Sequence, residues 1–152
     1  MQTASALVGL AFLAVGIAGF IPGITSNFDE LGFAGHESDA EIFDQFQVSV
    51  LHNIVHLAFG ILGLLAARSF SGARTFLVGG GALYLLLGVY DALVSQESSA
   101  NFLPTNNADS WLHLGLGAAM LALGLLLGRR RDRDYDVVRD ARRDQPVGAR
   151  AQ

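Results

Sequence analysis

The sequence contains no cysteine and no lysine, and these absences restrict its chemistry from the outset. Without cysteine the chain forms no disulfide, no thiolate metal site and no cysteine nucleophile. The motifs G-x-S-x-G and H-E-x-x-H are also missing, and the three glycines at residues 79–81 lack the lysine that a phosphate-binding loop requires. The sequence therefore carries no signature of a serine hydrolase, a zinc protease or a nucleotide-binding enzyme.

Apolar residues are abundant instead. They make up 51% of the 152 residues, and the mean hydropathy is +0.40. Four apolar blocks carry this excess, each close to the ~20 residues with which a helix crosses ~30 Å of hydrocarbon. They are residues 4–24, 48–67, 75–95 and 110–128. We therefore expect an all-α protein, a four-helix transmembrane bundle formed by residues 1–128.

The basic residues predict how the chain is oriented in the membrane. All ten are arginines: Arg68 and Arg74 lie between the second and third blocks, and the other eight follow the fourth. Positive residues stay on the cytoplasmic side, so a multi-pass topology with both termini in the cytoplasm is expected. In residues 129–152 arginine alternates with aspartate without apolar periodicity, which predicts a disordered cytoplasmic tail and argues against a nucleic-acid partner.

Two pairs of apolar blocks resemble each other. LHNIVHLAFGILGLLAAR, from Leu51, aligns with LHLGLGAAMLALGLLLGR, from Leu112, at an offset of 61. LVGLAFLAVGIAGF, from Leu7, aligns with LVGGGALYLLLGVY, from Leu77, at an offset of 70. These internal repeats predict a duplicated two-span hairpin, with both copies in the same orientation and a pseudo-symmetry axis along the membrane normal.

The connection between the first two blocks is long and acidic. Ser38 and Glu41 have the spacing of a capping box, and Ile42, Phe43 and Phe46 then fall on one side of a helix. This pattern predicts a short interfacial helix before the second span.

Glycines recur at helical spacing within the blocks, together with the polar residues. Small residues let helix backbones approach closely in lipid, where packing and hydrogen bonds drive association. We expect the following glycines to lie in the helix-packing seams: Gly16, Gly19, Gly60, Gly63, Gly88, Gly117 and Gly124.

Ionisable residues within the blocks are few and share one depth. With the predicted topology, His52, Asp91 and His113 lie roughly 5 Å inside the outer boundary, and His56 lies one turn deeper. An ionisable group there costs on the order of 2 to 3 kcal/mol unless it meets partners, so these side chains are expected to point inward and bond one another. Asn53 and Asn107 are the further candidates for this polar layer.

The polar layer has a structural interpretation and several functional ones. The leading hypothesis is that it holds the spans together in a non-enzymatic accessory or structural membrane protein, with no cofactor expected. Alternatively, histidines on two helices bind haem b, or two histidines and Asp91 bind a transition metal. A third hypothesis is a proton or small-solute relay, which would need an oligomer to form a pore. Expected partners are membrane lipids, a second copy of the chain or another membrane protein.

Three strings in the chain carry a family resemblance: LVGLAFLAVGIAGFIPGIT, LHNIVHLAFGILGLLAAR and NFLPTNNADSWLHLGLGAAMLALGLLL. With them the sequence resembles the domain-of-unknown-function family 4383, a family of small bacterial four-span membrane proteins. The resemblance implies a bacterial cytoplasmic membrane location and four spans. It implies no activity, no substrate and no site residue.

Overall fold

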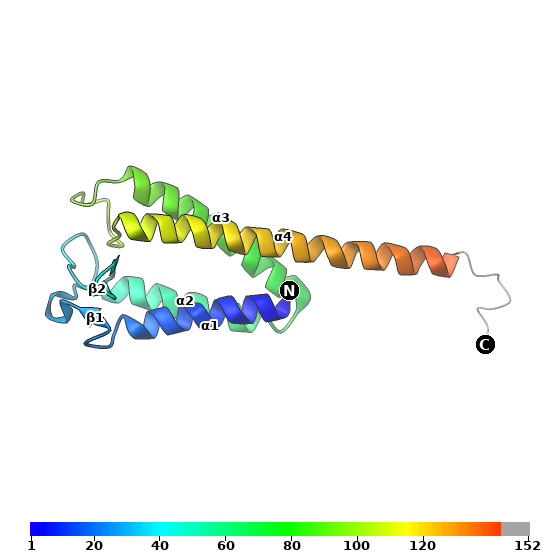
Figure 1. Ribbon diagram of the computed structural model, residues 1–152, viewed down its shortest axis with the longest axis horizontal. Helices are drawn as coiled ribbons and strands as arrows, with labels where there is room; N and C mark the ends of the chain where they lie inside the picture. The colour runs from blue at the N-terminus through cyan, green and yellow to red at the C-terminus, as the bar shows by residue number, and fades with distance from the viewer. Residues whose placement is uncertain (144–152) are drawn as a thin grey trace.

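The computed structural model describes the backbone of residues 1–143 and the side chains of residues 1–129, and Figure 1 shows two helical hairpins lying against each other. The first hairpin pairs α1 with α2 and the second pairs α3 with α4. The prediction of an all-helical protein with four helices is confirmed. The bounds are α1 Gln2–Ala18, α2 Val50–Ala66, α3 Phe70–Leu93 and α4 Asn107–Arg143.

Three of the helices begin at a polar cap that the sequence supplies just before the apolar run. Ser49 Oγ accepts a hydrogen bond from the His52 backbone N–H, at 3.1 Å, at the start of α2. Ser69 does the same for the start of α3. At α4, Asn106 Oδ1 accepts from two backbone N–H groups, at 2.9 and 3.1 Å. These caps satisfy amides that have no partner within the helix.

Two of the helices are long and apolar enough to cross a membrane: α3, and the Asn107–Arg129 part of α4. Helices α1 and α2 are apolar but have 17 residues each. The first helix ends at Ala18, earlier than predicted, because the chain turns before Pro22 and Thr25 Oγ1 donates to the Ala18 carbonyl at 3.0 Å. Four spans were predicted. By length and composition, two of the described helices, α3 and α4, can cross a membrane.

Large apolar side chains lie exposed on all four helices. Leu7 is 62% exposed on α1, Leu62 54% on α2, Leu86 69% on α3 and Leu126 59% on α4. Large exposed apolar patches are rare on soluble monomers, and where they occur they meet lipid or another protein.

The predicted interfacial helix before the second span is wrong. Residues in this region form a small antiparallel sheet in the order β1-β2-β3, with β1 at Thr25–Ser26, β2 at Glu41–Ile42 and β3 at Phe46–Gln47, as Figure 1 shows beside the start of α2. A one-turn 3-10 helix, η1, lies at Phe28–Glu30. Phe43 and Asp44 both adopt left-handed backbone angles, which a helix cannot contain and a tight hairpin turn requires.

Burial explains why the sheet is preferred. Ile42 packs with Ala40 and Val48 in a small core of its own, where a surface helix would leave this side chain at the interface. Ser38 does not cap a helix. Its hydroxyl donates to the Val48 carbonyl at 2.6 Å and accepts from the Gly32 N–H at 3.1 Å, so it closes the loop around that core.

The C-terminal segment differs from the prediction in part. The sequence predicts disorder from residue 129, whereas the backbone of α4 remains helical as far as Arg143. Residues 144–152 lie outside the part of the chain that the structure describes.

Glycines bring the helices of each hairpin into backbone contact. A Cβ added at Gly9 would lie 2.8 Å from the Gly60 carbonyl oxygen, and one added at Gly81 would lie 2.9 Å from the Gly117 carbonyl oxygen. These contacts relate Gly9 to Gly81, an offset of 72 residues, and Gly60 to Gly117, an offset of 57. The sequence alignment uses offsets of 70 and 61 for the same two pairs of helices. The alignment pairs Gly9 with Gly79, whose added Cβ would meet no described atom within 4 Å.

The other predicted packing glycines also lie where helices meet. Gly16 faces Leu57, Gly19 faces Asn53, Gly63 faces Gly9, Gly88 faces Leu114, and Gly124 faces Leu77 and Val78. Between the hairpins lies a core of Phe12, Leu77, Tyr84 and Met120. The rings of Phe12 and Tyr84 meet edge to face there, with centroids 5.1 Å apart.

Candidate metal centre

Three histidines converge near the end of the bundle that carries the small sheet. His52 and His56 lie one turn apart on α2, and His113 lies on α4. One ring nitrogen from each lies within 4.8 Å of the others, and the residues are only 3%, 7% and 2% exposed. Positions i and i+4 share one helix face, so the α2 pair faces α4 as a unit.

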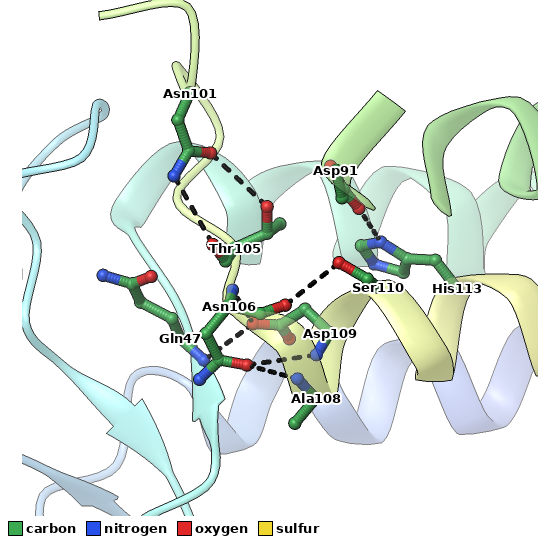
Figure 2. Close-up of polar contacts among 9 residues, drawn as sticks. All are labelled: Gln47, Asp91, Asn101, Thr105, Asn106, Ala108, Asp109, Ser110 and His113. Carbon is green, nitrogen blue, oxygen red and sulfur yellow. Dashed lines mark hydrogen bonds and ion pairs between the residues drawn. The ribbon is translucent and has the colours of Figure 1, made fainter. Parts of the chain in front are cut away.

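His113 has a fixed orientation. Its Nδ1 lies 2.6 Å from Oδ2 of Asp91 on α3, and both side chains are 3% exposed (Figure 2). The carboxylate accepts a hydrogen bond from Nδ1–H, so the other ring nitrogen, Nε2, has no proton in the neutral ring and can act as a ligand.

The two α2 histidines lack a hydrogen bond of the kind that His113 forms at Nδ1. The Nδ1 atoms of His52 and His56 are buried and have no hydrogen-bond partner among the described residues. Their rings lie against each other, with centroids 4.5 Å apart, and the His52 ring lies 5.9 Å from that of His113. A buried polar atom without a partner costs about 1 to 3 kcal/mol, so these nitrogens need an explanation.

The structure separates the other predicted members of the polar layer. Asn53 is fully buried, but its side chain packs on Gly19 of α1, and its amide nitrogen and oxygen have no partner among the described residues. Asn107 is exposed at the first residue of α4, outside the cluster. The sequence suggested two histidines and Asp91 as metal ligands. In the structure the group within ligand reach is His52, His56 and His113, and Asp91 bonds to His113.

Asp109 is a buried polar residue that is not among the predicted site residues. Its Oδ2 accepts from the backbone N–H of Gln47, at 3.0 Å, and of Asn106, at 2.9 Å, so it ties β3 to the start of α4 (Figure 2). The spacing of Asn106 and Asp109 is that of a capping box and could have indicated this arrangement. The Asn106 amide adds a bond to the Gln45 carbonyl at 2.8 Å.

Aromatic rings close the cluster on its deeper side. The Phe12 ring lies 5.7 Å from His56, and the Tyr84 ring lies 5.3 Å from His113, nearly perpendicular to it. These two contacts occupy corresponding places in the two hairpins. Sequence reasoning missed both rings, because an aromatic residue in an apolar block gives no sign of which neighbour it meets.

The three histidines fit a transition-metal ion. Neutral imidazole is a ligand for zinc, copper, iron and nickel, and zinc sites with three histidines leave one coordination position open. In a tetrahedral site two nitrogens at about 2.0 to 2.1 Å from the ion lie about 3.3 Å from each other, so a pair at the limit of 4.8 Å needs to close by about 1.5 Å. The Asp91 carboxylate behind His113 is the usual outer partner of a metal-binding imidazole.

The fold and the cluster define a small helical protein with apolar helices of membrane-spanning length and a buried group of histidines. Residues 2–126 match the sequence model of the domain of unknown function DUF4383, and the chain belongs to this family. No curated protein and no solved structure matches the chain. The family description assigns no activity, so the function has to be argued from the site.

Proposed function

We propose that this protein is a four-span protein of the bacterial cytoplasmic membrane that binds one transition-metal ion on His52, His56 and His113. The observation that carries the proposal is the pair of buried Nδ1 atoms on α2 that lack partners beside a histidine oriented by Asp91.

The membrane part of the proposal is supported by the exposed apolar side chains on every helix. Helices α1 and α2 are each about 25 Å long, at the short end of the range that spans a bilayer, and α3 and α4 are longer. The positions of the arginines support an orientation with the α2–α3 connection and both termini in the cytoplasm and the small sheet outside.

The duplicated-hairpin hypothesis is supported by the matching contacts of Gly9 with Gly60 and of Gly81 with Gly117. His56 and His113 occupy corresponding positions in this register, since His56 lies four residues before Gly60 and His113 lies four residues before Gly117. The site therefore lies where the two hairpins meet. His56 and His113 are its corresponding members, and His52 of the first hairpin is a third.

A purely structural polar layer explains the residues less well. Such a layer should satisfy its own members, yet only the bond between His113 and Asp91 forms, while His52 and His56 keep nitrogens without partners among the described residues. For this reason we prefer the metal-binding alternative to the expectation that no cofactor is bound. Haem b is less favoured, because one ring nitrogen from each of the three histidines lies within 4.8 Å of the others, so this spacing singles out no two of them as axial ligands on opposite sides of a porphyrin plane.

Metal analysis of the purified protein tests the proposal. The detergent-solubilised chain is loaded with zinc, dialysed, and measured by mass spectrometry of the metal, with circular dichroism as the check on folding. We expect about one zinc per chain. His56→Gln and His113→Gln should lose it, and His36→Gln should keep it, because His36 lies in the outer connection away from the cluster.

Two outcomes would overturn the proposal. One is a folded wild-type chain that retains no zinc, cobalt or copper at micromolar concentration. The other is loss of metal from the His36→Gln variant with retention in His113→Gln. A Soret absorption band in the protein as purified would replace the metal ion by haem.

A further inference from the structure

A cavity of about 310 Å³ adjoins the three histidines. Helix α1 contributes Val8, Phe12 and Val15 to its wall, and α4 contributes Leu112 and Leu116. The histidine rings of the cluster are among its few polar groups. A largely apolar pocket with a few convergent polar groups is the usual form of a small-molecule site, and this volume is at the lower end of the range of about 300 to 1,000 Å³.

The cavity reaches the surface between the two hairpins. Several of its lining residues are exposed: Val15 by 37%, Leu112 by 43% and Phe43 by 70%, and Ala11 is exposed as well. These residues are apolar, as are the exposed leucines of the helices. With the proposed topology, the opening faces the lipid near the outer side of the membrane, so an occupant enters from the bilayer.

We infer that this cavity binds a neutral, lipid-soluble molecule, with an oxygen-bearing head against the histidine cluster and an apolar body that leaves between α1 and α4. The inference rests on the proposed function, because the head oxygen takes the coordination position that three histidines leave open. Compounds with a carbonyl head and a long apolar tail, such as isoprenoid quinones, have this chemistry.

Charge favours a neutral head over an anionic one. A divalent ion at the cluster would already face two carboxylates, Asp91 behind His113 and Asp109 in the cavity wall. Asp109 accepts two backbone N–H bonds at one oxygen, and a divalent ion beside the cavity would favour its ionised form. A third negative charge would exceed the two positive charges of the ion and would be buried in a cavity lined mainly by apolar side chains, which is costly. Fatty-acid anions are therefore excluded from the class we infer.

The experiment uses the cobalt(II)-loaded protein in detergent, because the visible absorption of cobalt(II) reports its coordination number and ligands. A benzoquinone with a ten-carbon tail is the neutral probe, and dodecanoate is the anionic comparison. We expect the quinone to change the cobalt spectrum saturably, and dodecanoate to leave it unchanged.

A matched pair of variants locates the binding site. Ala11 lines the cavity and Ala14 does not, and both are exposed on α1 one turn apart. Ala11→Phe should fill the opening and weaken quinone binding by at least about tenfold, while Ala14→Phe should bind as the wild type does. Both should bind cobalt normally, since neither residue is one of the three proposed ligands.

Each outcome separates the two proposals. If wild-type protein shows no cobalt spectrum, the metal site fails, and the inference fails with it. If cobalt binds and the quinone leaves the spectrum unchanged, or if Ala11→Phe binds quinone as tightly as Ala14→Phe, only the inference fails. An equal response to dodecanoate would contradict the neutral head.

Discussion

Nδ1 of His113 lies 2.6 Å from Oδ2 of Asp91, and this bond joins α4 to α3 inside the bundle. Both groups are almost fully buried, so solvent screens their interaction little. The bond holds the His113 ring in place, and one nitrogen of this ring lies within 4.8 Å of a ring nitrogen of each α2 histidine. The Asp91 carboxylate thereby fixes the position of His113, the third histidine of the cluster.

Replacing Asp91 by asparagine should weaken metal binding without removing a ligand. Loss of an outer-shell carboxylate typically reduces metal affinity by about 10- to 100-fold, and we expect a change in this range for Asp91→Asn, measured by competition with a chromophoric chelator. Glu97→Gln is the control and should bind as the wild type does, because Glu97 is an exposed acid in the connection after α3. Equal affinities in the two variants would mean that Asp91 serves packing alone.

Two nearby glycines of α3 should respond to alanine in opposite ways. A Cβ at Gly81 would lie 2.7 Å from the Leu121 backbone nitrogen, so Gly81→Ala forces α3 and α4 apart and should destabilise the protein by about 1 to 3 kcal/mol. At Gly79 the added methyl group meets no described atom within 4 Å, so Gly79→Ala should be neutral or stabilise the helix by up to about 1 kcal/mol. Thermal unfolding in detergent measures both, and a similar loss in both variants would contradict the packing.

Removal of the Asp109 carboxylate should loosen the sheet from α4. Asp109→Ala leaves the N–H groups of Gln47 and Asn106 without their acceptor, at a cost of about 1 to 3 kcal/mol each if they stay buried. Hydrogen exchange at these two amides should become faster. Asp39→Ala, at an exposed position in the same outer region, should leave their exchange unchanged. Unchanged exchange in Asp109→Ala would show that the two amides are held by other contacts.

The absence of cysteine makes the topology directly testable. Single cysteines are introduced as Glu37→Cys, Ser99→Cys and Ser71→Cys, all at exposed positions. With both termini in the cytoplasm, a membrane-impermeant maleimide added to intact spheroplasts should label the first two, and should label Ser71→Cys only after lysis. Labelling of Ser71→Cys in sealed cells, or of Ser99→Cys only after lysis, would contradict four spans in this orientation.

Much of the helical architecture could be predicted from residue order. The four apolar blocks correspond to four helices, because helix formation by a long apolar segment depends mainly on local sequence. The start of α2 also follows from local chemistry, since Ser49 precedes the block and caps it. The same reasoning failed for residues 38–46, where spacing suggested a helix. The sheet forms there because strand pairing and burial of Ile42 involve residues far away in the chain, such as Thr25.

For the site, the chain's pattern and depth were enough to single out His52, His56, Asp91 and His113 as buried and mutually close. Their division of roles depends on how each helix is rotated about its axis and how closely the glycines let the helices approach, which residue spacing does not specify. That rotation turns Asn53 toward Gly19, leaves Asn107 exposed and sets Asp91 behind His113. Helix formation is a local property of the sequence, whereas convergence of three imidazoles from two helices arises only once the hairpins pack.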